Sequence, residues 1–171
     1  RTLHPGERII AFSCYAETAE ALYASIKGDG HAALLTARGA RIASGPTSRQ
    51  DLMGQFGPDA GEVRRRILSH QQVDFLIATD LLSEGVNLQE ASVLIHLDLP
   101  WTSARMGQRI GRLARMGSRH ASVVSYSVCP PPRAEAVLHE IEIITRKSGL
   151  SSQLLGPPPG LDPDARASTP A

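Results

Sequence analysis

The sequence predicts an α/β domain in which a parallel sheet is flanked by helices on both faces. Short apolar runs rich in β-branched residues alternate along the chain with segments of helical periodicity. The main apolar runs lack the alternation of a half-exposed strand, which indicates strands buried on both faces, as in parallel sheets. Only 4% of the residues are aromatic, so the core must be built from alanine, valine, isoleucine and leucine.

Each expected element follows from its local pattern. The first helix has small and apolar residues at helical spacing and is expected to close at Gly28. Thr47 or Ser48 is a suitable N-cap for the second helix, and Thr102 or Ser103 for the fourth. The expected strands cover residues 8–14, 31–36, 40–45, 73–79, 91–100 and 121–128, and the expected helices cover 15–28, 47–56, 61–71, 102–117 and 130–150.

Bulk properties limit the class of protein. A chain of 171 residues suits one domain of ordinary size, and its net charge of +1 excludes a strongly basic molecule. The sequence contains no apolar run long enough to span a bilayer, and its first residues have no secretion-signal core. Cys14 and Cys129 have no metal-ligand spacing, so they are interpreted as two reduced core thiols of a cytosolic protein.

Polar residues follow the apolar strand expected at 73–79. Ligands of parallel α/β sheets bind in the loops at the carboxyl ends of the strands. Thr79 and Asp80 end this strand, and Glu84, Gly85 and Asn87 come shortly after. This segment is therefore a candidate site, and Gly85 would let backbone approach a phosphate closely. The alternative is that Thr79 and Asp80 only cap the next helix and that Gly85 only ends it.

The second candidate is an arginine-rich helix. Its arginines are spaced four, three, three and four residues apart and no acid lies among them, so they fall on about a third of the helix circumference. Like charges on one stripe repel, which favours an anionic ligand, although a solvated arginine face is the alternative. A separate stripe of small residues would allow close approach of a neighbouring element. The arginines are Arg105, Arg109, Arg112, Arg115 and Arg119, and the small residues are Ala104, Gly107, Gly111 and Ala114.

These segments together resemble the second RecA-like lobe of superfamily-two helicases. The stretch "IATDLLSEGVNLQ" resembles motif V, and "QRIGRLAR" matches the motif VI pattern Q-x-x-G-R-x-x-R. "RIIAFSCYAETAEAL" is similar to motif IV, and "SGPTSRQDLMGQF" to the segment that follows it. The resemblance covers roughly residues 8–128 and is closest to the bacterial Swi/Snf-like branch, whose members are mostly double-stranded DNA translocases.

The resemblance implies roles for individual residues. Arg112 and Arg115 match the motif VI arginines that reach the γ-phosphate of ATP, with Arg115 as the arginine finger. Gln108, Glu84, Gly85 and Asn87 would face the nucleotide, although many relatives have Asp in place of Asn87. Thr79, Asp80, Gly45 and Arg49 would contact nucleic acid, although Arg49 also fits a structural ion pair.

The resemblance also implies an organisation and partners. Residues 1–129 would form the lobe, 130–150 a helix on or beyond it, and 151–171 a disordered tail or linker. ATP with Mg²⁺ would be bound mainly by an N-terminal RecA-like lobe of the same protein. The other expectations are a double-stranded DNA track, a cytoplasmic, nucleoid-associated location, no membrane contact and a monomeric isolated chain.

Two elements of such an ATPase are missing from the sequence. It contains no Gly-Lys pair for a phosphate-binding P-loop and no Asp-Glu pair to hold Mg²⁺. The chain alone is therefore expected to be inactive. The alternative function is a catalytically inactive RecA-like module that binds or scaffolds partners. The six histidines are scattered along the sequence, and His96 and His120 are expected to be structural.

Overall fold

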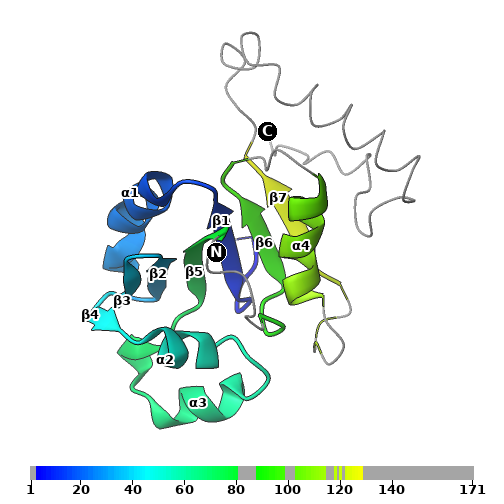
Figure 1. Ribbon diagram of the computed structural model, residues 1–171. Helices are drawn as coiled ribbons and strands as arrows, with labels where there is room; N and C mark the ends of the chain where they lie inside the picture. The colour runs from blue at the N-terminus through cyan, green and yellow to red at the C-terminus, as the bar shows by residue number, and fades with distance from the viewer. Residues whose placement is uncertain are drawn as a thin grey trace.

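The computed structural model describes residues 3–80, 88–98, 103–114, 118, 120 and 122–128. Among these residues, seven strands form one sheet with helices around it (Figure 1). The strands are β1 (Ile9–Ser13), β2 (Ala32–Thr36), β3 (Gly39–Ile42), β4 (Gly45–Thr47), β5 (Phe75–Thr79), β6 (Val93–His96) and β7 (Val124–Ser127). The α-helices are α1 (Ala16–Ile26), α2 (Arg49–Gly54), α3 (Ala60–Arg66) and α4 (Ser103–Leu113), and two 3₁₀ turns are η1 (Lys27–Asp29) and η2 (Ser69–Gln71).

The sheet has the order β4-β3-β2-β5-β1-β6-β7. Strands β2, β5, β1, β6 and β7 are parallel, which confirms the expected parallel sheet. The hairpin β3–β4 adds an antiparallel edge that the sequence analysis did not predict. Its cause is connection length: only Ala37 and Arg38 join β2 to β3, whereas a parallel crossover needs a dozen residues or more.

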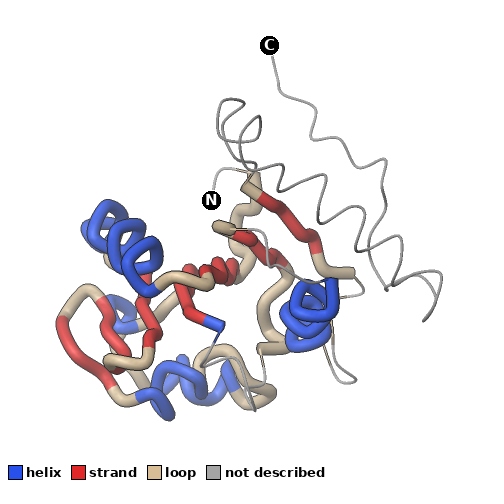
Figure 2. The backbone as a smooth tube through the Cα atoms, turned by 45° about the horizontal axis from the view of Figure 1, so that its top comes forward, coloured by secondary structure: helices blue, strands red, loops and turns tan. Residues whose placement is uncertain are grey.

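Both faces of the sheet are covered by helices, as expected from the apolar strands. On one face Ala11, Leu34 and Ile77 pack with Ala19 and Tyr23 of α1. The opposite face contains a larger cluster that joins the sheet to α2 and α4. Figure 2 shows the central strands between α1 and the pair α2 and α3. The larger cluster includes Ile10, Phe12, Leu35, Leu76 and Leu94 from the strands, Leu52 from α2, and Leu113 from α4.

Helix ends agree with the predicted caps in one case and differ in two. Ser48 is the N-cap of α2, since its Oγ accepts a hydrogen bond from the Asp51 amide at 2.9 Å. Gly28 does not close the first helical segment; η1 continues it to Gly30, whose φ of 80° is the left-handed conformation that favours glycine. The helix expected at 61–71 is interrupted after Arg66, because Ile67 and Leu68 have extended backbone.

Other expectations are corrected or lie outside the described residues. Cys14 lies half-buried at the end of β1 and not in the apolar core, while Cys129 is outside the described part of the chain. The proposed helix at 130–150 and tail at 151–171 are also outside it. In the part that is described, no helix combines the length and apolar character needed to cross a bilayer.

Candidate functional site

The carboxyl ends of β1, β5 and β6 bring polar residues together. The three strands are parallel neighbours, and Ser13 lies opposite Thr79 while Phe12 lies opposite His96. The residues that follow each strand therefore emerge at one edge of the sheet. They include Cys14 after β1, Asp80 after β5, and Asp98 shortly after β6. This is the edge where the sequence analysis placed a ligand site.

Arg109 of α4 occupies the centre of this edge. Its side chain is only 2% exposed. Nε and Nη2 each donate to one carboxylate oxygen of Asp80 at 2.7 Å, which is a bidentate ion pair. Nη1 contacts Nδ1 of His96 at 3.0 Å, and Nη2 lies 3.5 Å from Oδ1 of Asp98. One guanidinium thus connects α4 to residues after β5, within β6 and after β6.

Asp98 extends this cluster to β1. Its carboxylate accepts hydrogen bonds from the Ser13 hydroxyl and from the Cys14 amide, the latter at 2.9 Å. The Cys14 thiol lies 3.4 Å from an oxygen of Asp80 and 3.5 Å from Nη2 of Arg109. We call Ser13, Cys14, Asp80, His96, Asp98 and Arg109 the strand-end cluster. It ties the ends of three strands to one helix.

The charges of the strand-end cluster are mutually stabilised. Burial alone raises the pKa of Asp80, but the hydrogen bonds and charge of Arg109 outweigh it, so the pKa lies below its usual value. Burial likewise opposes the charge of Arg109, and Asp80 reverses the effect and raises its pKa. Burial, together with the carboxylates of Asp98 and Asp80, raises the pKa of Cys14 to about 12. At neutral pH the cluster therefore holds an ion pair and a protonated thiol.

His96 is also neutral at pH 7. Burial and the nearby Arg109 charge lower its pKa to about 4. Nδ1 of the neutral ring therefore accepts the hydrogen bond from Arg109, and the proton resides on Nε2. Nε2 has no hydrogen-bond partner among the described residues. These contacts agree with the structural role expected for His96.

The pKa of His96 predicts a pH dependence of stability. Between about pH 6.5 and pH 4 the unfolded histidine binds a proton and the folded one does not, so acidification favours unfolding. The full shift corresponds to roughly 3 kcal/mol. Urea unfolding of the 171-residue chain from pH 7 to pH 4 measures this loss. His96→Asn keeps an acceptor for Arg109 but does not titrate, so its free energy of unfolding should fall less on acidification. The exposed control His70→Asn should follow the wild type. If the free energy of unfolding falls equally with pH in all three proteins, the pKa assigned to His96 is wrong.

The structure corrects the interpretation of the arginine stripe at Arg109. The sequence contains no acid near Arg109, but the fold brings Asp80 to it from 29 residues earlier. Arg109 is therefore neutralised and buried, and it does not point at an external anion. A signal was present: Met106 and Leu113 lie three residues before and four after it, and both are buried, so position 109 belongs to the inward side of the helix.

The remaining predicted residues fall in different places. Gln108 is exposed on α4, Arg112 is half-buried, and Arg49 is the exposed first residue of α2. Thr79 is 4% exposed, and its hydroxyl has no hydrogen-bond partner in the described part of the chain. Gly45 pairs with Ile42 at the amino-terminal end of the sheet, so the structure does not bring it near Thr79. Glu84, Gly85, Asn87 and Arg115 lie outside the described residues, and the roles of all these residues stay predictions.

The outer face of α4 carries the stripe of small residues. Ala104, Gly111 and Ala114 are exposed, and Gly107 is half-buried. A Cβ added at Gly107 or Gly111 would meet no atom of the described residues within 4 Å. Each interior glycine costs an exposed helix on the order of 1 kcal/mol relative to alanine. Among the described residues nothing contacts the glycines of this surface, so in that part of the chain it is open to the close approach of another element.

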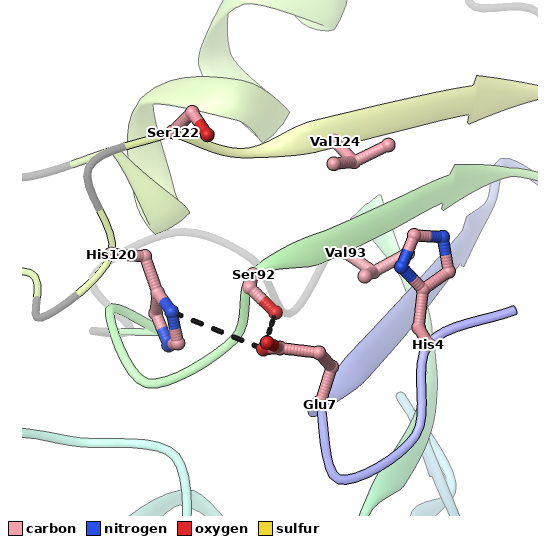
Figure 3. Close-up of a pocket in the computed structure, with 7 residues that line it drawn as sticks. All are labelled: His4, Glu7, Ser92, Val93, His120, Ser122 and Val124. Atoms are coloured by element: carbon pink, nitrogen blue, oxygen red, sulfur yellow. Dashed lines mark hydrogen bonds and ion pairs between the residues drawn. The ribbon is translucent and has the colours of Figure 1, made fainter.

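A separate cavity lies at the amino-terminal ends of the strands, away from the strand-end cluster. It has a volume of about 300 Å³ and lies at the amino ends of β6 and β7 (Figure 3). Several of its polar groups have partners: His4 contacts the Tyr126 hydroxyl, Ser92 donates to Glu7, and His120 lies 3.9 Å from Glu7. Nε2 of His120 also lies 3.2 Å from the Glu90 carbonyl oxygen, in agreement with its expected structural role. The described residues contain no group of side chains that could hold a metal ion.

Comparisons with known proteins agree with this geometry. The helicase conserved C-terminal domain family matches residues 2–117. Over 85 residues the chain is 34% identical to the uncharacterized ATP-dependent helicase YqhH of Bacillus subtilis, covering 50% of this chain and 15% of that protein. It is 27% identical to the ATP-dependent RNA helicase RhlB of Shewanella pealeana, covering 89% of this chain and 32% of that protein. The chain thus spans a third or less of these relatives.

Solved structures support the same fold. The C-terminal part of the Fun30 ATPase domain superposes with a TM-score of 0.56 at 16% identity, covering 80% of this chain and 38% of that one. The C-terminal domain of Saccharomyces cerevisiae Dbp5, bound to Gle1 and IP6, gives a TM-score of 0.52 at 21% identity, covering 91% of this chain and 74% of that one. The fold is therefore RecA-like, and the chain belongs to the helicase conserved C-terminal domain family.

Proposed function

We propose that this chain is the second ATPase lobe of a two-lobe, ATP-dependent nucleic-acid translocase or helicase. The observation that carries the proposal is the orientation of α4. Its inner side is fixed to the sheet through Arg109, while Gln108 and the small-residue stripe face outward with no described neighbour near the glycines. A helix held in this way presents motif VI to a partner surface, and an N-terminal RecA-like lobe of the same protein is that partner.

The chemistry that the lobe supplies is charge stabilisation. ATP with Mg²⁺ provides the phosphoryl group and the metal that neutralises its oxygens, and both would be held mainly by the other lobe. Arg112 and Arg115 would direct guanidinium groups at the γ-phosphate, with Arg115 as the arginine finger. Gln108, Glu84, Gly85 and Asn87 would line the nucleotide side of the cleft. Guanidinium, amide and backbone N–H donors fit a polyphosphate.

The isolated chain should not hydrolyse ATP. It contains neither a Gly-Lys pair for a P-loop nor an Asp-Glu pair for Mg²⁺. An arginine finger lowers the barrier only when another element binds and positions the phosphates. Activity therefore belongs to the protein that carries both lobes. A scaffold module without turnover is the competing function, and it predicts that even the two-lobe protein is inactive.

We propose double-stranded DNA as the track, in line with the resemblance to the Swi/Snf-like branch. Thr79, Gly45 and Arg49 are the positions proposed to line or flank it, whereas the carboxylate of Asp80, the fourth position suggested by the resemblance, is bound to Arg109. RNA is a second candidate, because a relative named as an ATP-dependent RNA helicase aligns with 89% of the chain. RNA differs from DNA in its 2′-hydroxyl and in its A-form grooves, so the two tracks can be distinguished by stimulation of the ATPase.

We expect double-stranded DNA to raise the ATPase rate of the two-lobe protein about tenfold or more, and duplex or single-stranded RNA of the same length to raise it less. The measurement is steady-state phosphate release at fixed, low salt, because phosphate contacts weaken as salt rises. The matched control is the same protein with Arg115→Ala. If only RNA stimulates the ATPase, the track is RNA and not DNA. If the two-lobe protein shows no turnover under any condition, the scaffold function is favoured.

A further inference from the structure

The strand-end cluster does more than bury Arg109. The segment 81–87, which carries the motif V residues, is flanked by two residues that both bind α4. Before it, the Asp80 carboxylate accepts both hydrogen bonds from Arg109. After it, the Leu88 amide donates to the carbonyl oxygen of Arg112 at 3.3 Å. One helix is therefore the common anchor for both flanks of this segment.

The attachment point on α4 is close to the proposed reacting groups. Arg112 follows Arg109 by three residues, which is less than one helical turn and a rise of about 4.5 Å. A rotation or translation of α4 at Arg109 therefore displaces Arg112 together with Asp80, the residue that precedes segment 81–87. Arg109 itself is 2% exposed and committed to Asp80, so it does not reach toward the nucleotide.

We infer that Arg109 is a positioning residue, and that its bidentate pair with Asp80 fixes the registry between motif V and motif VI. This inference rests on the proposed function, because Arg112 and Arg115 are the groups that it would position. It assigns to Asp80 a role that differs from the nucleic-acid contact suggested by the resemblance. His96 and Asp98 contact Nη1 and Nη2 of Arg109 and so also fix the orientation of its guanidinium group.

The chemistry of the pair favours a geometric role. Burying an ion pair costs desolvation, and well-packed apolar residues in its place are often as stable. Position 109 lies on the inward side of α4 with the buried Met106 and Leu113, where apolar residues are the usual choice. What an apolar residue cannot provide is the planar guanidinium fork, which fixes direction as well as distance against Asp80 and contacts His96 at the same time.

The experiment compares two paired substitutions in the two-lobe protein. Arg109→Met with Asp80→Asn removes the pair at the strand ends. Arg64→Met with Asp74→Asn is the matched control, because Arg64 binds Asp74 at 2.7 Å and the Val73 carbonyl at 2.6 Å, away from α4. We expect the first variant to lose on the order of 100-fold in kcat, the cost of a small misplacement of catalytic groups. KM for ATP should stay within about threefold, and the control should keep the wild-type kcat.

A conservative variant keeps the test valid if the double variant does not fold. Arg109→Lys retains the charge but loses the bidentate fork, and we expect a kcat between those of the wild type and the double variant. Wild-type kcat in either Arg109 variant would overturn the positioning role, as would a rise in KM with unchanged kcat.

Failure of the inference is distinguishable from failure of the proposed function. If Arg115→Ala is inactive while both Arg109 variants are fully active, the finger assignment stands and the positioning role is wrong. If the wild-type two-lobe protein has no ATPase, or if Arg115→Ala retains full activity, the proposed function of motif VI is wrong.

Discussion

Replacing Arg115 with alanine in the two-lobe protein is expected to lower kcat for ATP hydrolysis by about 10³-fold or more, in the range found for arginine fingers. The guanidinium would contact the phosphoryl oxygens most strongly in the transition state, so its loss raises the barrier more than it weakens binding. The dissociation constant for ATP should change by less than about fivefold. Single-turnover hydrolysis and a fluorescent-nucleotide titration measure the two quantities separately.

Two further substitutions control this experiment. Arg66→Ala removes an exposed arginine on α3 that pairs with Glu62 at 3.1 Å, and it should leave kcat unchanged. Arg112→Ala tests the other motif VI arginine and should also reduce turnover. If Arg115→Ala retains turnover while Arg112→Ala loses it, the finger is Arg112. If both variants retain turnover, neither arginine acts on the transferred phosphoryl group.

The second large effect is on stability. Arg109→Met in the 171-residue chain is expected to lower the free energy of unfolding by about 3–5 kcal/mol. The substitution leaves the carboxylates of Asp80 and Asp98 beside each other at the strand ends, where their side chains are only 20% and 19% exposed. Adding Asp80→Asn should recover part of the loss, because it removes one of the uncompensated charges. Urea unfolding at pH 7 measures the free energy of unfolding of the wild type, of Arg109→Met and of the double variant.

The control for stability is Arg64→Met. Arg64 makes an ion pair of the same length with Asp74, but the Asp74 side chain is 34% exposed, so water can solvate it when its partner is removed. We expect Arg64→Met to lower the free energy of unfolding clearly less than Arg109→Met does. Equal losses, or a loss below about 1 kcal/mol for Arg109→Met, would show that the strand-end cluster does not carry the expected electrostatic stabilisation.

Local sequence patterns predicted much of the fold. The apolar runs located all the parallel strands, because a strand buried on both faces needs apolar residues at successive positions. The strand at 73–79 also identified the edge of the sheet where Asp80 and Asp98 meet, since ligand sites of parallel sheets follow strand ends. Ser48 was one of two candidates for the N-cap of α2, and its hydroxyl does bind the Asp51 amide.

The features that could not be predicted depend on contacts between distant residues or on the exact ends of helices and strands. The partner of Arg109 is 29 residues away, and no local pattern says which carboxylate the fold will bring to it. The antiparallel hairpin β3–β4 depends on short connections whose lengths are uncertain when strand boundaries are read from sequence. The end of the first helical segment at Gly30, two residues later than expected, reflects an added 3₁₀ turn.

ATP hydrolysis by the 171-residue chain, compared with hydrolysis by the two-lobe protein, tests most directly whether this lobe completes a site that it does not itself contain. The measurement is phosphate release at matched concentrations, with and without double-stranded DNA. We expect turnover only from the protein with both lobes, because the nucleotide is bound by the partner lobe and Arg115 acts across the cleft. DNA-stimulated turnover by a pure preparation of the 171-residue chain would contradict this assignment.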